Sequence, residues 1–183
     1  MAENPYTTYA ELRPSKKIVV NLLEGKEFNS VLEVGCQWGE NLIAIREKFP
    51  DKKIVGVDAD WDGIVQEAKT ITGLDIRKGS VFSLEFQDKE FDVVFTNALF
   101  CMLQPEQIET GLKEIIRVAK KYIILIELKT EEFIGIVKGG RTGADWVSLL
   151  GKYGLEATTK KIPSKVWGAN PWVDNGYIYE VKL

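Results

Sequence analysis

The stretch Val31-Leu32-Glu33-Val34-Gly35-Cys36-Gln37-Trp38-Gly39-Glu40-Asn41-Leu42 decides the fold of this 183-residue chain. It is typical of a buried strand, a turn with two glycines and the start of a helix. Further along, Lys53-Ile54-Val55-Gly56-Val57-Asp58 is typical of a second apolar strand, which ends in a carboxylate. Ligands of open α/β sheets bind outside the carboxyl ends of the strands, where a carboxylate suits a ribose diol. The two segments therefore predict a crevice for a nucleotide-like cofactor.

The glycine spacing excludes two common phosphate-binding loops. A dinucleotide fingerprint that begins at Gly35 would need glycines at positions 37 and 40, where the chain has Gln37 and Glu40. No Gly-Lys-Ser/Thr triplet follows, so the segment is not a P-loop either. Instead, Glu33 precedes the turn; this acid would repel a pyrophosphate but favours a ligand with an ammonium group. The pattern predicts a cofactor that is cationic in part.

The pattern Glu33-x-Gly35-x-Gln37-x-Gly39, followed by Gly56-Val57-Asp58, resembles the first two motifs of class I S-adenosylmethionine-dependent methyltransferases. Three later segments resemble the family's adenine-contacting turn, its fourth-strand motif and its helix with the fifth strand; they are 76–82, 91–99 and 114–127. In order and spacing, these segments cover most of residues 30 to 128. A looser likeness points to pseudaminic-acid-type methylases, although the Leu99-Phe100-Cys101 run replaces the histidine found there before the proline.

The resemblance implies S-adenosyl-L-methionine as the cofactor. Asp58 would accept hydrogen bonds from both ribose hydroxyls, and Glu33 would hold the methionine end indirectly. The residues that the resemblance places at the cofactor are Glu33, Thr96 and Asn97 at the methionine end, Gly35, Cys36, Gln37 and Gly39 in the turn, Asp58 and Ala59 at the ribose, and Ser80 and Val81 at the adenine edge.

Two positions depart from the family pattern. Gln37 stands where a glycine is usual, and if the turn needs a positive φ there, glutamine costs roughly 1 kcal/mol relative to glycine. Ser80 stands where an aspartate commonly accepts from the adenine amino group, and a hydroxyl accepts less strongly than a carboxylate. We therefore expect a modest affinity for the cofactor.

The composition narrows the classes of protein. A length of 183 residues predicts one domain, and a net charge of −3 with a pI near 5.2 argues against nucleic acid as a partner. Two cysteines without metal-type spacing, Cys36 and Cys101, and the absence of histidine predict no metal site. No apolar run reaches the roughly 18 residues of a membrane span, and residues 1–5 lack a signal pattern. We expect a cytoplasmic protein; its oligomeric state is not predicted.

Strands that alternate with helices predict an α/β fold with parallel units, and two final strands without a crossover helix predict an antiparallel pair. The resemblance implies a Rossmann-like, doubly wound, seven-stranded sheet in the order 3-2-1-4-5-7-6, with an antiparallel last strand. Residues 1–29 would form a cap helix, 30–128 the cofactor core, and 129–183 a helix with the strand pair. Strands are expected at 30–34, 53–57, 75–78, 91–96, 122–128, 155–162 and 176–181, and helices at 9–24, 39–48, 62–70, 105–119 and 142–153.

The function that these features imply is methyl transfer to a small molecule by direct displacement, for which no catalytic residue is required or assigned. The compact chain leaves little room for a recognition domain. Two alternatives remain open: a non-catalytic partner or regulatory subunit that binds the cofactor, and a methyltransferase for protein or RNA. The last would be favoured if a basic face were continuous with the crevice; that face comprises Lys138, Arg141, Lys160, Lys161 and Lys165. An N-terminal segment with Tyr6, Tyr9 and Arg13 could close over the cofactor.

Overall fold

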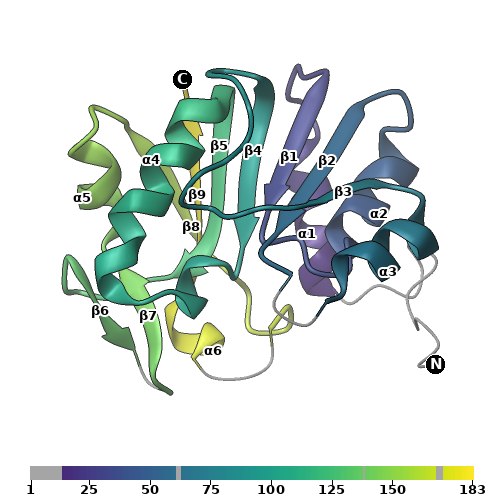
Figure 1. Cartoon of the computed structure of the whole chain (residues 1–183). Coiled ribbons are helices and arrows are strands. Elements are labelled where there is room, and N and C mark those ends of the chain that lie inside the picture. Colours follow the sequence, from purple (N-terminus) through teal and green to yellow (C-terminus); the bar gives the residue numbers. More distant parts are fainter. Residues whose placement is uncertain (1–13, 61–62, 138, 168–170) are drawn as a thin grey trace.

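The computed structural model describes residues 14–60, 63–137, 139–167 and 171–183. Within these residues, a seven-stranded sheet has the order β3-β2-β1-β4-β5-β9-β8 (Figure 1). Its strands are β1 (Ser30–Val34), β2 (Lys53–Asp58), β3 (Asp75–Lys78), β4 (Phe91–Asn97), β5 (Ala119–Leu128), β8 (Ala157–Lys161) and β9 (Gly176–Lys182). Strands β1 to β5 are parallel, whereas β9 runs antiparallel to both of its neighbours. The predicted Rossmann-like sheet, with its antiparallel last strand, is confirmed.

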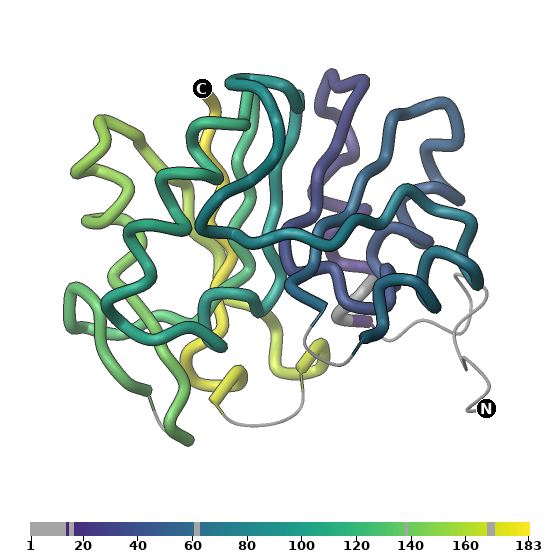
Figure 2. The backbone as a smooth tube through the Cα atoms, in the orientation of Figure 1, coloured from purple at the N-terminus to yellow at the C-terminus, as the bar shows by residue number. Residues whose placement is uncertain are grey.

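Helices cover both faces of the sheet. Helices α1 (Pro14–Leu23), α2 (Glu40–Lys48) and α3 (Val65–Thr72) pack on one face, and α4 (Ile108–Val118) and α5 (Trp146–Gly151) pack on the other. Successive residues of a strand point to opposite faces, so β1 directs Leu32 and Val34 toward α4 and Val31 toward α1 and α2. Residues 79–90 connect β3 to β4 without a helix, and Figure 2 shows this connection crossing the sheet on the α4 side.

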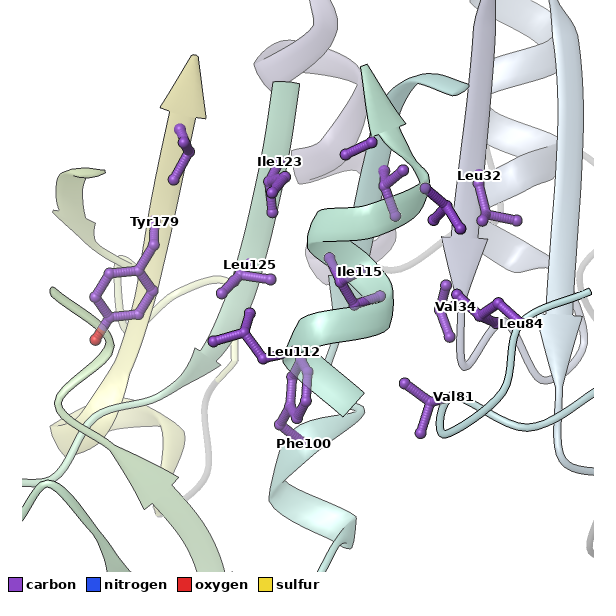
Figure 3. Packing of buried hydrophobic residues seen from close by; sticks show 14 of the residues in the cluster. Leu32, Val34, Val81, Leu84, Phe100, Leu112, Ile115, Ile123, Leu125 and Tyr179 are labelled. Carbon is purple, nitrogen blue, oxygen red and sulfur yellow. The ribbon is translucent and has the colours of Figure 1, made fainter. Parts of the chain in front are cut away.

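The hydrophobic core on the α4 side stabilises the half of the sheet that contains β4, β5 and β9. Ile108, Leu112 and Ile115 repeat at helical spacing and are fully buried. Figure 3 shows Leu112 and Ile115 on the side of α4 that faces Ile123 and Leu125 of β5. Each such side chain contributes about 1.5–3 kcal/mol by leaving water. This packing fixes α4 over the strands whose carboxyl ends form one edge of the sheet.

The prediction of a helix over residues 142–153 is wrong at its N-terminal end. Thr142 to Ala144 belong to β7 (Arg141–Ala144), which forms a two-stranded hairpin with β6 (Ile134–Val137). Gly139 and Gly140 both have positive φ and make the turn that allows this pairing. Helix α5 starts only at Trp146, after Asp145, whose side chain accepts from the backbone N–H of Ser148 at 3.3 Å.

Other boundaries differ from the expected ones by a few residues. The short helix α6 (Trp172–Asn175) lies inside the segment expected to be a loop, and β8 begins two residues later than predicted. Strand β5 begins at Ala119 rather than Tyr122, directly after α4, and residues 105–107 form a 3-10 turn (η3, Pro105–Gln107) before that helix. Helix α3 begins at Val65, three residues later than expected. The predicted N-terminal contacts of Tyr6, Tyr9 and Arg13 lie outside the described residues.

Gly56 in β2 provides a sharp test of packing beneath the glycine turn. A Cβ atom there would lie 2.6 Å from Leu42 Cδ1 and 2.7 Å from Cys36 Sγ, closer than van der Waals contact allows. We expect Gly56→Ala to lower the free energy of unfolding by about 1–3 kcal/mol in denaturant titrations, because the buried neighbours must shift. Gly151→Ala is the matched control: nothing lies within 4 Å of its Cβ position, so that variant should lose no stability. Equal stability of both variants would contradict this packing.

Candidate active site

A cavity of about 740 Å³ lies at the carboxyl edge of the parallel strands. This edge is the lower one in Figure 1, toward which β1, β2, β4 and β5 run. The ends of β1, β2 and β4 line one part of the cavity, together with the segment that follows β3. The 3-10 turn η2 (Phe100–Met102), the start of β7 and the segment around α6 line the rest. The site therefore lies at the place where open α/β sheets bind ligands.

The turn between β1 and α2 takes the left-handed backbone that its glycines permit. The φ angles of Gly35, Gln37 and Gly39 are 83°, 45° and 73°. The backbone N–H groups of Gly35 and Cys36 both donate to Val57 O, at 2.7 and 3.1 Å, which pins the turn to the end of β2. The turn does require a positive φ at Gln37, so glutamine carries there the expected cost of roughly 1 kcal/mol relative to glycine.

Asp58 organises the loops on both sides of it. Its Oδ2 accepts from the backbone N–H of Gln37 at 2.9 Å, and its Oδ1 accepts from the backbone N–H of Asp60 at 2.9 Å. An ionised carboxylate offers about four lone-pair sites, so these two bonds leave acceptor capacity toward the cavity. The half-buried carboxylate can therefore hold the turn and still receive two hydroxyl groups.

A layer of buried polar side chains lies beneath the methionine end predicted from the sequence. Asn41 Nδ2 donates to Glu33 Oε1, and Asn97 Nδ2 donates to Asn41 Oδ1 at 3.4 Å. Glu33, Asn41 and Asn97 are all buried. Because Asn97 also lines the cavity, hydrogen bonds through Asn41 link Glu33 to the cavity wall. This arrangement agrees with an indirect role for Glu33.

Glu127 at the end of β5 is the residue that sequence reasoning did not single out. It is fully buried, and its Oε1 accepts from Thr96 Oγ1 at 2.8 Å and from the backbone N–H of Leu99 at 2.9 Å. Burial raises the pKa of Glu127 to about 7, although these hydrogen bonds oppose the rise. Its Oε2 has no hydrogen-bond partner among the described residues. Glu127 thus holds the Leu99 turn, which forms part of the cavity wall.

The structure brings seven of the eleven predicted site residues to the cavity and leaves four behind its wall. Glu33 lies beneath the wall, Thr96 faces Glu127, and buried Cys36 lies against Gly56. Gly39 caps α2 with a left-handed backbone. The predicted residues that line the cavity are Gly35, Gln37, Asp58, Ala59, Ser80, Val81 and Asn97.

The other half of the cavity is mostly apolar and was not predicted as a unit. Trp167 and Trp172 lie with ring centroids 3.8 Å apart, and burial raises the pKa of the Cys101 thiol to about 12. Two features of the sequence could have located this half: Trp167 and Trp172, in a segment expected to be a loop, and Arg141, a member of the predicted basic face. The principal residues of this apolar half are Leu99, Cys101, Met102, Leu103, Arg141, Trp167 and Trp172.

The chain belongs to the methyltransferase domain family, because the model of that family matches residues 31–122, half of its length. This membership confirms the predicted class, an S-adenosylmethionine-dependent methyltransferase, and with it the cofactor. The narrower likeness to pseudaminic-acid-type methylases stays a prediction. Within the described residues, no group of three or more histidine, cysteine, aspartate or glutamate side chains could hold a metal ion.

A curated Haemophilus influenzae relative, described as an uncharacterized protein, is 28% identical over an alignment of 102 residues that covers 52% of this chain and 40% of that protein. The chain therefore matches less than half of that relative. A Pyrococcus horikoshii protein superposes with a TM-score of 0.70 at 17% identity, over 98% of this chain and 96% of that one. The Burkholderia thailandensis 1,6-didemethyltoxoflavin-N1-methyltransferase, with 1,6-didemethyltoxoflavin and S-adenosylhomocysteine bound, superposes with a TM-score of 0.67 at 16% identity. This superposition covers 93% of this chain and 76% of that one. These two likenesses show a shared fold.

Proposed function

We propose that this chain transfers a methyl group from S-adenosylmethionine to a small-molecule acceptor that binds in the apolar half of the cavity. One observation carries the proposal: a single cavity joins the Asp58 carboxylate and the glycine turn to a wall of apolar and aromatic side chains. Small-molecule sites are concave, mostly apolar and supplied with a few polar groups. The Burkholderia thailandensis neighbour, whose name describes a methyltransferase for a small ring compound, supports the same reading.

The residues at the sheet edge fit the cofactor. Asp58 would receive the ribose hydroxyls on its remaining acceptor sites, and Ser80 and Val81 would meet the adenine. Gly35 brings bare backbone to the cavity, and a Cβ atom there would come within 2.9 Å of Leu99 Cδ1. Asn97, held through Asn41 to Glu33, would lie beneath the methionine end. When bound, the cofactor would supply a methyl carbon on a sulfonium; attack of the acceptor nucleophile on that carbon would break the carbon–sulfur bond and release S-adenosylhomocysteine.

The chain's own contribution is alignment and the exclusion of water. Well-oriented reactants gain on the order of 7–11 kcal/mol over the bimolecular reaction, which the walls of the cavity can provide by holding the acceptor in line. Asp58 is the one carboxylate among the described lining residues, and the raised pKa of Cys101 keeps that thiol protonated at neutral pH. The described lining of the apolar half therefore offers no carboxylate or thiolate base, so an acceptor group that carries a proton would release it to water as its lone pair forms the bond to the methyl carbon.

The arrangement of basic residues disfavours a macromolecular acceptor. Of the described members of the predicted basic face, Arg141 lines the cavity, whereas Lys160, Lys161 and Lys165 do not. Lys138 lies outside the described residues. The open apolar half next to Asn97 likewise favours turnover over a purely binding role.

Two further expectations stay predictions: that residues 1–183 form one domain and that the protein is cytoplasmic. None of the helices in the described parts of the chain is long and apolar enough to cross a membrane.

The test is transfer of radiolabelled methyl from S-adenosylmethionine into a cell extract, separated afterwards into a low-mass filtrate and a macromolecular retentate. We expect the label in a small product in the filtrate, together with release of S-adenosylhomocysteine. Label in protein or RNA would contradict the small-molecule proposal. Cofactor binding without any transfer would favour the non-catalytic alternative.

A further inference from the structure

The two halves of the cavity differ in charge. Among the described lining residues, Asp58 is the one acid and Arg141 is the one base. Asp58 ends β2, whereas Arg141 begins β7 and contacts Met102 of η2, beyond β4. Strand β7 belongs to the separate two-stranded sheet, and in the seven-stranded sheet β1 lies between β2, which carries Asp58, and β4, which leads to η2. The cavity thus has an anionic end for the ribose and a cationic rim at its apolar end.

Arg141 has little to bind within the protein. Its guanidinium has one polar contact among the described residues, a donation from Nη1 to Met102 Sδ. A thioether is a weak acceptor, whereas a guanidinium has five N–H donors in a planar fork that fits a carboxylate. No described carboxylate forms an ion pair with it, although other basic side chains such as Arg117 and Arg77 have acidic partners. The charge nevertheless reaches into the cavity, since it opposes the rise in the pKa of Cys101.

The walls near Arg141 are suited to a flat apolar body. The indoles of Trp167 and Trp172 and the side chains of Leu99 and Leu103 line this half of the cavity. The indole N–H of Trp167 is buried and has no hydrogen-bond partner among the described residues. Aromatic walls favour a ring, and an unpaired guanidinium favours an anion.

We propose that Arg141 selects an acceptor that consists of an aromatic ring bearing a carboxylate. This inference rests on the proposed function and names the substrate class of the same site. Arg141 would hold the carboxylate at the rim, so that the ring lies along the tryptophan walls and the nucleophilic atom points toward the cofactor half. Its role is that of a specificity residue.

The test uses calorimetric titration of the whole chain with S-adenosylhomocysteine present at saturation. The probes are benzoate, indole-3-carboxylate and quinoline-2-carboxylate, each compared with its neutral amide. We expect at least one acid to bind about tenfold or more tightly than its amide. In Arg141→Gln this preference should disappear, and Arg141→Lys should keep part of it because the charge remains without the fork. Lys161→Gln, an exposed residue that does not line the cavity, is the matched control and should behave as the wild type.

Three outcomes would overturn the proposal. The amides could bind as tightly as the acids, the preference could survive in Arg141→Gln, or none of the acids could bind to protein that has bound S-adenosylhomocysteine. A loss of S-adenosylhomocysteine affinity in Arg141→Gln, with the acid preference intact, would assign Arg141 to the cofactor instead. Failure of the wild type to bind S-adenosylhomocysteine at all would be a failure of the proposed function, which the first titration detects separately.

Discussion

Asp58→Ala is expected to weaken S-adenosylmethionine binding by about a hundredfold. The variant loses the carboxylate that we propose as the acceptor of two ribose hydroxyls; two hydrogen bonds to a charged group, at roughly 1.5–3 kcal/mol each, correspond to about a hundredfold or more. It also removes the carboxylate that accepts from the N–H groups of Gln37 and Asp60, so the turn that we propose as part of the cofactor site loosens. Calorimetric titration measures the dissociation constant, and circular dichroism checks that the fold persists.

The control for this experiment is Asp75→Ala. Asp75, the first residue of β3, is also a carboxylate of the sheet, but it pairs with exposed Arg77 at 2.7 Å and does not line the cavity. Exposed ion pairs contribute about 0–1 kcal/mol, so this variant should bind the cofactor as the wild type does. Unchanged affinity in folded Asp58→Ala would refute the assignment of Asp58 to the ribose.

The second large effect is expected at Glu127. Glu127→Ala should lower the free energy of unfolding by about 3 kcal/mol, because it leaves the Thr96 hydroxyl and the N–H of Leu99 buried without their acceptor and opens a cavity. Glu127→Gln is the matched variant, since its amide oxygen can replace Oε1 as the acceptor. We therefore expect Glu127→Gln to retain most of the stability at pH 5 in urea titrations.

The pH dependence of the same residue provides an independent measurement. The pKa of Glu127 is about 7 in the folded state and near 4.5 in the unfolded chain, so the unfolded chain releases its proton first as the pH rises. The contribution of Glu127 to stability is complete below the unfolded pKa and falls by about 1.4 kcal/mol per pH unit between pH 5 and 7. Glutamine has no such dependence. The stability of Glu127→Gln relative to the wild type should rise over that interval, and a constant difference would contradict a buried neutral carboxyl.

Local patterns were sufficient for the positions of the strands of the large sheet and for the glycine turn, whereas the order of the strands came from the family resemblance. The apolar runs of β1 and β4 are bounded by turn residues and buried on both faces, which makes them recognisable without tertiary information. Gly35 and Gly39 mark the turn because a positive φ is easy for glycine alone. The positive φ of Ala98, 64°, by contrast, has no sequence signal; it occurs next to Leu99, whose backbone N–H donates to Glu127.

Tertiary contacts determine the parts that were missed. Strands β6 and β7 have four residues each and pair with one another, so neither has a pattern long enough to separate it from the start of a helix. The apolar half of the cavity combines η2, β7 and residues around α6, which lie far apart in the chain. Glu127 follows an apolar run, but nothing in the sequence says that the Leu99 turn covers it. Sequence patterns thus predicted the glycine turn and the strand ends of the cavity better than its apolar half.

Calorimetric titration of the wild-type chain with S-adenosylmethionine and S-adenosylhomocysteine, with NAD as the control, tests the central claim most directly. The geometry of Asp58 and the glycine turn predicts micromolar binding of the first two compounds at one site and no binding of NAD, because Glu33 and the glycine spacing disfavour a pyrophosphate. Absence of binding by both sulfur compounds, or equal binding of NAD, would contradict the account of this cavity as an S-adenosylmethionine site.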